Sequence, residues 1–143
     1  MINLRRVLAA KIAITVFAWA IPLLLFPADL LVFLGFPSPQ PEIFLRLLGT
    51  AYCALVVGYV LGFNKTKANK YPVEAVWVGI ASNGGATVIL AIAAVMGAWS
   101  NWGVFAQIYM WFSLLSVALI TFGLVMFGPC TAVANSQRIE SVG

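Results

Sequence analysis

Hydrophobic residues fill four long stretches of the chain, and short segments rich in charge, proline or glycine separate them. The stretches cover residues 7–26, 43–63, 73–96 and 104–127, approximately. Each is close to the roughly 20 mainly apolar residues that a helix needs to cross a membrane. The pattern therefore predicts an all-α fold, a four-helix transmembrane bundle that forms a single integral membrane domain over residues 1–143.

The connection between the first two stretches reads FPADLLVFLGFPSPQPE and predicts a further short helix. Pro27 suits a first helical turn, Asp29 lies where an acid favours the helix dipole, and Gly35 ends the segment. We expect this helix to rest on the outer membrane interface or to pack at the mouth of the bundle. The prolines after it predict a stiff, extended connector.

Composition supports a membrane protein, because 63% of the residues are hydrophobic and only 8% are charged. A soluble domain carries roughly 25% charged residues, so membrane lipids are expected to cover most of this surface. The net charge of +4 does not predict nucleic-acid binding, since the cations lie in short segments between the apolar stretches.

The positions of those cations predict the orientation of the chain. Cations mark the cytoplasmic side of a membrane protein, which would place both termini in the cytoplasm and the protein in a bacterial inner membrane. The segments on the other side contain only Arg46 as a cation. The three basic segments hold Arg5, Arg6 and Lys11 at the start, Lys65, Lys67 and Lys70 in the middle, and Arg138 in the tail.

Of the charged residues within or beside the apolar stretches, Arg46 and Glu74 are the candidate sites. Arg46 follows Glu42 by four residues, so the two side chains would be neighbours on a helix. Arg46 is either an anchor for an anion or an interfacial residue paired with Glu42 or Asp29; we favour the pairing. Glu74 is expected in the first turn of the third helix, after Pro72, where an acid is favourable. A proton-exchanging carboxylate would have to lie deeper.

The sequence SNGGAT at 82–87 lies near the middle of the third stretch. The helical period separates Asn83 from Glu74 by about 180°, so one pocket cannot easily hold both. We interpret SNGGAT as a contact point between helices, with Asn83 hydrogen-bonded across to a hydroxyl, a backbone carbonyl or Gln107. A broken helix with a binding site is the alternative. The predicted helix-packing seam consists of small residues, Ala51, Ala54, Gly58 and Gly62 in the second helix and Gly79 in the third.

Residues suited to catalysis or metal binding are scarce. The chain has no histidine, its two cysteines, Cys53 and Cys130, are far apart, and no nucleotide-binding motif is present. We therefore predict no catalytic residues, no metal, no cofactor, no disulfide and no enzyme activity.

The segments PEIFLRLLGTAYCALVVGYVLG and VEAVWVGIASNGGATVIL, with a cationic loop between them, resemble small bacterial four-helix membrane proteins of the BphX-like family. The similarity lies in the R-L-L-G opening of the second helix, a Gly and a Tyr near its end, and a third helix rich in small residues. It covers about half of the chain and identifies no catalytic residue. The resemblance implies an accessory role linked to aromatic compounds.

These observations lead to three functional hypotheses. The first is a non-enzymatic accessory or scaffold protein that binds a second copy of itself or another membrane protein. The alternative is a small transporter or permeability factor for hydrophobic molecules, with an interior lined by Trp77, Tyr109 and Trp111. The third is a membrane enzyme that acts on lipids or quinones, which the shortage of reactive residues disfavours.

Overall fold

The computed structural model describes residues 2–128 and shows an all-helical protein within them. The N-terminal rod consists of α1 (Ile2–Ile14), the π-helical turn η1 (Thr15–Ala20) and α2 (Ile21–Leu25), and a short helix, α3 (Ala28–Phe33), follows it. Three long helices complete the fold: α4 (Ile43–Lys67), α5 (Val73–Val95) and α6 (Val104–Phe127). The rod and the three long helices are each long and apolar enough to cross a membrane. Within the described residues, the prediction of an all-helical fold with four helices of this kind is therefore confirmed.

The wide turn η1 in the N-terminal rod has a cause in the sequence. Proline in a helix lacks an N–H group, and its ring collides with the carbonyl four residues earlier. Pro22 lies in the first turn of α2, directly after η1. The Ile21 amide donates to the Val16 carbonyl, five residues back, and this wider turn gives the proline ring room within a continuous rod.

The connections between helices begin with the same stop signal. Gly35, Asn69 and Gly97 have positive φ angles of 88°, 56° and 67°, a conformation that Gly and Asn tolerate best. Each follows the capping residue of a helix, and the next amide donates back to a carbonyl in the last turn. Gly35 also accepts a hydrogen bond from the Gly103 amide at 2.9 Å, which ties the end of α3 to the α5–α6 connection.

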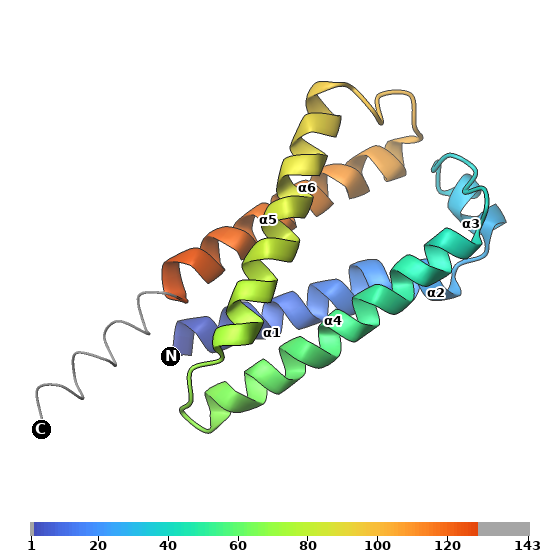
Figure 1. The fold of residues 1–143 in the computed structure, drawn as a ribbon. Coiled ribbons are helices and arrows are strands. Elements are labelled where there is room, and N and C mark those ends of the chain that lie inside the picture. Colours follow the sequence, from blue (N-terminus) through green and yellow to red (C-terminus); the bar gives the residue numbers. More distant parts are fainter. Residues whose placement is uncertain (1, 129–143) are drawn as a thin grey trace, which may run out of the picture.

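The helices form two pairs that meet at one end of the molecule. The N-terminal rod packs along α4, and α5 packs along α6. Figure 1 shows the pairs close together near the N-terminus and separated toward α3 and the α5–α6 connection. Among the described residues, α1 contacts α6 and α4 contacts α5, whereas the backbones of η1 and α2 contact neither α5 nor α6. At the open end, the two pairs are therefore joined by side chains and by the hydrogen bond from Gly103 to Gly35.

The hydrophobic core lies at the closed end, where the pairs meet. The absence of a side chain lets helices approach there: a Cβ added at Gly79 of α5 would lie 2.6 Å from Leu124 Cδ1 of α6. Backbone approach of this kind drives helix association in lipid. The cluster of buried residues at this end consists of Leu4, Leu8, Val76, Ile120 and Leu124.

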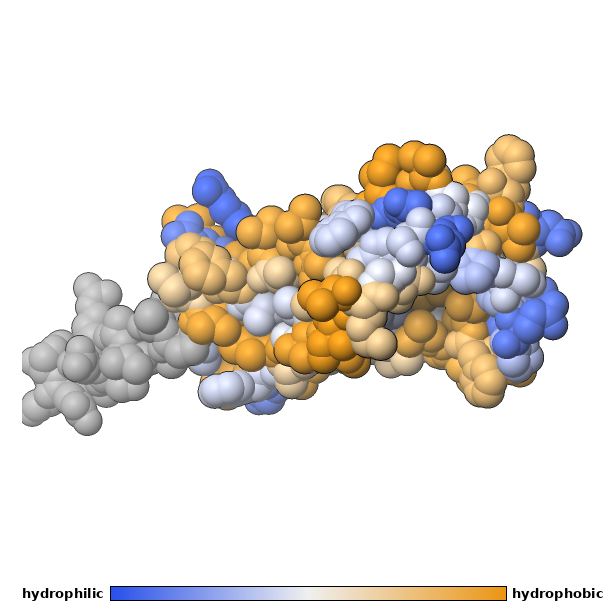
Figure 2. Space-filling model, turned by 90° about the horizontal axis from the view of Figure 1, so that it is seen from above, coloured by the Kyte–Doolittle hydropathy of each residue, from blue (hydrophilic) through white to orange (hydrophobic). Residues whose placement is uncertain are grey.

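The outer surface is apolar along much of its length, as Figure 2 shows for one face. Large hydrophobic side chains such as Val95 and Leu119 are 90% and 69% exposed, which is the expected arrangement where lipid is the solvent. The closed end carries the basic residues of α1 and of the α4–α5 loop, and the Arg5 guanidinium donates to the Thr66 carbonyl at 2.9 Å. The orientation is predicted from cations that gather on one side of the membrane, and these residues do gather at one end. The orientation itself stays a prediction.

Candidate functional site

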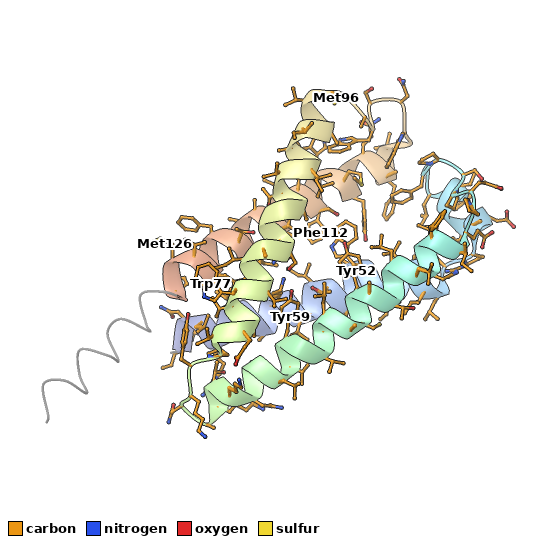
Figure 3. The ribbon with its side chains drawn as sticks, in the orientation of Figure 1. Tyr52, Tyr59, Trp77, Met96, Phe112 and Met126 are labelled. Atoms are coloured by element: carbon orange, nitrogen blue, oxygen red, sulfur yellow. The ribbon has the colours of Figure 1, made fainter. Side chains whose placement is uncertain are left out.

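Two cavities adjoin one another between the helix pairs. The inner cavity has a volume of about 280 Å³ and the outer cavity, toward α3, about 290 Å³. Trp19 and Met110 line both cavities, so these two side chains form the boundary between them. Tyr52 and Tyr59, which line the inner cavity, extend from the side of α4 that faces the other helices (Figure 3).

Lys11 is the distinguishing residue of the inner cavity. It is the tenth residue of α1, about 14 Å along the rod at 1.5 Å per residue, and it is only 1% exposed. Its ammonium nitrogen lies 4.2 Å from the centroid of the Tyr59 ring. A cation over an aromatic face is stabilised by the ring quadrupole. Within residues 2–128 this is the single interaction that the ammonium makes.

Acidic side chains do not compensate the charge of Lys11 in the described part of the chain. The three acidic residues of the described part, Asp29, Glu42 and Glu74, are all exposed. Glu42 pairs with Arg46 and Glu74 pairs with Lys65. A buried charge is normally paired, because removing it from water costs several kcal/mol. Lys11 therefore lies beside a cavity without an acidic partner among residues 2–128.

The other polar groups of the inner cavity come from α4 and α5. The Tyr59 hydroxyl and Ser82 Oγ share a hydrogen bond of 2.9 Å. Asn83 lines the same cavity, and its amide nitrogen Nδ2 is buried without an acceptor in the described residues. The interhelical hydrogen bond predicted for Asn83 is therefore absent there. Gln107 instead donates from Nε2 to the carbonyls of Ser100 and Trp102, because it lies at the start of α6, next to that loop.

Aromatic rings bridge the two helix pairs where their backbones separate. Trp19 of η1 lies 5.7 Å from Tyr52 of α4 and 5.8 Å from Tyr109 of α6, between ring centroids. Tyr109 in turn meets Phe36 at 5.6 Å. The wide turn η1 thus brings Trp19 to the boundary of the cavities, which agrees with the frequent occurrence of π-turns at functional sites.

The outer cavity is almost entirely apolar. Its walls come from α2, α3, the proline-rich connector and the start of α6. Most lining residues are aromatic, aliphatic or proline. Ser38 and Tyr109 are the described lining residues that carry a hydroxyl group. An apolar space next to a space with a few polar groups is the usual layout of a small-molecule site.

Arg46 has a structural role that the sequence indicates only in part. Its Nη2 lies 3.6 Å from Glu42 Oε2, as the preferred interpretation expects. In addition, Nη1 donates to the Leu23 carbonyl at 2.9 Å. The partner of that carbonyl in a regular helix would be the N–H of residue 27, which is a proline. Arg46 thus satisfies a carbonyl that Pro27 leaves without a donor.

Glu74 lies in the first turn of α5, as predicted, and is exposed. Its Oε2 accepts a hydrogen bond from Lys65 Nζ at 2.8 Å, and Pro72 is the N-cap residue directly before the helix. Asn83, by contrast, lines the inner cavity. The separation of Glu74 from Asn83 by the helical period is therefore observed.

The predicted packing seam is only half correct. Gly62 packs against Ala75 of α5, and Gly79 packs against Leu124. Ala54 and Gly58 are exposed, and a Cβ added at Gly58 would meet nothing within 4 Å. The seam fails because α4 and α5 diverge from their common loop, so the small residues farther along α4 have no helix opposite them.

SNGGAT does not break α5, which is continuous through it. It is also not the close contact that we predicted. A Cβ added at Gly85 would meet nothing within 4 Å, and one at Gly84 would meet only Thr121 Cγ2 at 3.7 Å. The neighbouring residues Ser82, Asn83 and Ala86 line the inner cavity instead.

The predicted aromatic lining is also corrected. Trp77 is 61% exposed and Trp111 49% exposed, and neither lines the two cavities. Tyr109 lines the outer cavity. Trp99 is buried, and its ring centroid lies 5.8 Å from that of Trp111.

Sequence reasoning missed Lys11, because it counts this residue with the basic N-terminus. The signal is nevertheless present: Lys11 lies inside the first apolar stretch, and ionisable residues in such stretches are rare and functional by default. Thr15 and Trp19, at i+4 and i+8, line the same cavity. An i, i+4, i+8 stripe of Lys, Thr and Trp marks one helix face.

The cysteines and the possible metal ligands are the remaining candidate residues. Cys53 is exposed and free, whereas Cys130 and Arg138 lie outside the described residues. Within residues 2–128, no three His, Cys, Asp or Glu side chains cluster as metal ligands would. Comparisons with protein-family models, with curated proteins and with solved structures find no match.

Proposed function

We propose that this protein is a non-enzymatic membrane protein that binds hydrophobic small molecules within its helix bundle and so carries them into or across the membrane. The observation that supports this proposal is the pair of adjoining cavities of about 290 and 280 Å³ behind a shared boundary of Trp19 and Met110. Ligand sites are concave, largely apolar and supplied with a few polar groups. The resemblance to the BphX-like family implies a role linked to aromatic compounds, which also favours hydrophobic ligands.

The arrangement of the helices supports a route to the cavities. The two helix pairs share a compact core at the closed end and are bridged by aromatic side chains at the open end. Rotation of a side chain needs far less reorganisation than separation of packed helices. Trp19 is thus well placed to control passage between the cavities without unfolding any helix.

The test of this proposal blocks the inner cavity from one helix face. Ala86 lines the cavity, whereas Ala81 of the same helix is exposed on the outside. Ala86→Phe should abolish the binding of twelve-carbon amphiphiles such as dodecanol or dodecanoate, measured by native mass spectrometry in mild detergent. Ala81→Phe, the matched control, should bind as the unmodified protein does. Circular dichroism checks that both variants keep their helices.

Uptake into proteoliposomes completes the test. Vesicles that contain the protein should accumulate the bound amphiphile faster than empty liposomes, and Ala86→Phe should remove the difference. If no twelve-carbon amphiphile binds, or if Ala86→Phe and Ala81→Phe behave alike, the proposal is wrong.

A second candidate function, that of an accessory or scaffold protein, is favoured by the exposed small residues of α4. Among the described residues nothing lies within 4 Å of a Cβ added at Gly58, and Ala54 is exposed. Such residues permit close approach of a partner helix in lipid. We propose a second copy of the chain as the partner. Chemical cross-linking in native membranes should yield a dimer that Gly58→Leu abolishes. A strict monomer would exclude this candidate.

A further inference from the structure

We propose that the inner cavity binds the anionic head of an amphipathic molecule, with the ammonium of Lys11 as its counter-charge and the outer cavity as the place for its apolar chain. This inference rests on the proposed function and adds the chemical class of the ligand. It starts from the charge of Lys11, which is 1% exposed and has no acidic partner among residues 2–128.

The described residues that line the inner cavity together with Lys11 come from four elements, and none of them is acidic. The rod contributes Thr15, α4 contributes Tyr52 and Tyr59, α5 contributes Ser82 and Asn83, and α6 contributes apolar residues. The ring of Tyr59 compensates part of the charge, by about 2 kcal/mol for a desolvated pair. That is less than the several kcal/mol that burial of an ammonium costs. An anionic ligand would supply the missing compensation.

The free hydrogen-bonding capacity of the cavity favours acceptors on the ligand. The Tyr59 and Ser82 hydroxyls already engage one another. Among the described residues that line this cavity, the buried group without a partner is a donor, Nδ2 of Asn83, and an ammonium has donors and no acceptor. A carboxylate or phosphate offers negative charge together with several acceptor oxygens, whereas an alcohol offers no charge and an amine adds repulsion.

The shape of the two cavities favours a molecule with one polar end. The inner cavity holds the polar groups, and the adjoining outer cavity is walled by residues such as Leu31, Phe36 and Phe105. An apolar chain there is removed from water at a gain of about 0.8 kcal/mol for each buried methylene. The same head chemistry occurs in free fatty acids and in anionic phospholipids, so the experiment must separate these two sources.

The experiment compares head groups of different charge on the same twelve-carbon chain. It also compares a free fatty acid with a phospholipid, both of which are anionic. The purified full-length protein in a neutral detergent is titrated with dodecanoate, dodecanol and dodecylammonium, and with phosphatidylglycerol, and complexes are counted by native mass spectrometry. Dodecanoate should bind at least about 10-fold more tightly than dodecanol, the effect of one charge-assisted contact. Dodecylammonium should not bind.

Variants then assign the preference to Lys11. Lys11→Met should reduce dodecanoate affinity by about 10-fold or more and leave dodecanol affinity unchanged, while Lys11→Arg should retain most of the preference. Lys67→Met is the matched control, because Lys67 also lies over a ring, that of Phe63 at 4.9 Å, but is exposed. Phosphatidylglycerol binding that depends on Lys11 would assign the anion to a lipid, and binding of dodecanoate alone would assign it to a free fatty acid. Both results support the anionic site.

The two proposals fail in different ways. If dodecanol binds as tightly as dodecanoate, and Lys11→Met changes neither affinity, the inference about the anion is wrong and the proposed hydrophobic carrier stands. If none of the probes binds, both are wrong. Thermal unfolding of each variant shows that a lost complex does not result from a lost fold.

Discussion

The ammonium of Lys11 lies 4.2 Å from the centre of the Tyr59 ring, and this contact joins the middle of the N-terminal rod to α4 across the inner cavity. It places a charge where a membrane protein normally has none. The stabilisation that the ring provides is smaller than the cost of burying the charge. In the absence of a ligand, Lys11 should therefore make the fold less stable than an apolar residue would.

The first prediction follows directly. Lys11→Met should raise the free energy of unfolding of the ligand-free protein by about 1–4 kcal/mol, since apolar replacement of an uncompensated buried ion is neutral or stabilising. Denaturation in mixed detergent micelles measures the change. Lys67→Met should lie within about 0.5 kcal/mol of the unmodified protein, as surface substitutions usually do. A marked loss of stability in Lys11→Met would show that the ammonium serves a structural purpose.

The second prediction separates the hydroxyl of Tyr59 from its ring. Tyr59→Phe removes only the hydrogen bond to Ser82 and should cost about 0.6 kcal/mol, the typical value inside membranes. Tyr59→Leu also removes the ring below the ammonium and leaves space in a fully buried position, so it should cost about 2 kcal/mol or more.

A double-mutant cycle assigns the additional cost of Tyr59→Leu. In the Lys11→Met background, Tyr59→Leu should cost about 1–2 kcal/mol less than in the unmodified protein, because the cation is no longer present. Additive effects of the two substitutions would mean that ring and ammonium do not stabilise one another.

The sequence predicts the helices well and their packing poorly, for a physical reason. Length and hydropathy determine a membrane span almost alone, because the bilayer requires a complete set of internal backbone hydrogen bonds. Stop signals such as Gly35 and Gly97 are equally local. Which face of a helix meets a neighbour depends instead on crossing angles. Gly58 and Gly62 lie on one face at small-residue spacing, yet only Gly62 meets another helix.

The candidate site depends on the same nonlocal information. Lys11, Tyr59 and Asn83 come from three helices, and no spacing in the sequence brings them to one cavity. The sequence identifies Asn83 as a polar residue at mid-depth. It does not show that the side-chain amide nitrogen lacks a hydrogen-bond acceptor among the described residues. Trp77 and Trp19 both lie within apolar stretches, and the sequence does not distinguish them. Only the divergence of the two helix pairs determines that Trp19 lines the cavities.

The third prediction compares two glycines of α4. Gly62→Ala places a methyl group against the side chain of Ala75, and overpacking of this kind costs about 1–3 kcal/mol. Gly58→Ala meets open space and should stabilise the monomer by about 0.5–1 kcal/mol, since alanine is the better helix former. Unfolding midpoints of the two variants should therefore shift in opposite directions. Shifts of the same sign would contradict the observed divergence of α4 and α5.

The last prediction concerns the carbonyl of Leu23, which Pro27 deprives of its helical donor and which Arg46 Nη1 satisfies at 2.9 Å. Arg46→Met leaves this part-buried carbonyl without a donor and should destabilise the protein by about 1–3 kcal/mol. Arg46→Lys, which keeps a single cationic donor on a flexible stem, should recover part of the loss. Arg6→Met, at an exposed arginine of the closed end, serves as the control and should change stability by less than about 0.5 kcal/mol. If Arg46→Met were as stable as Arg6→Met, the contact with Leu23 would have no energetic importance, and Arg46 would be free to act as an anion anchor.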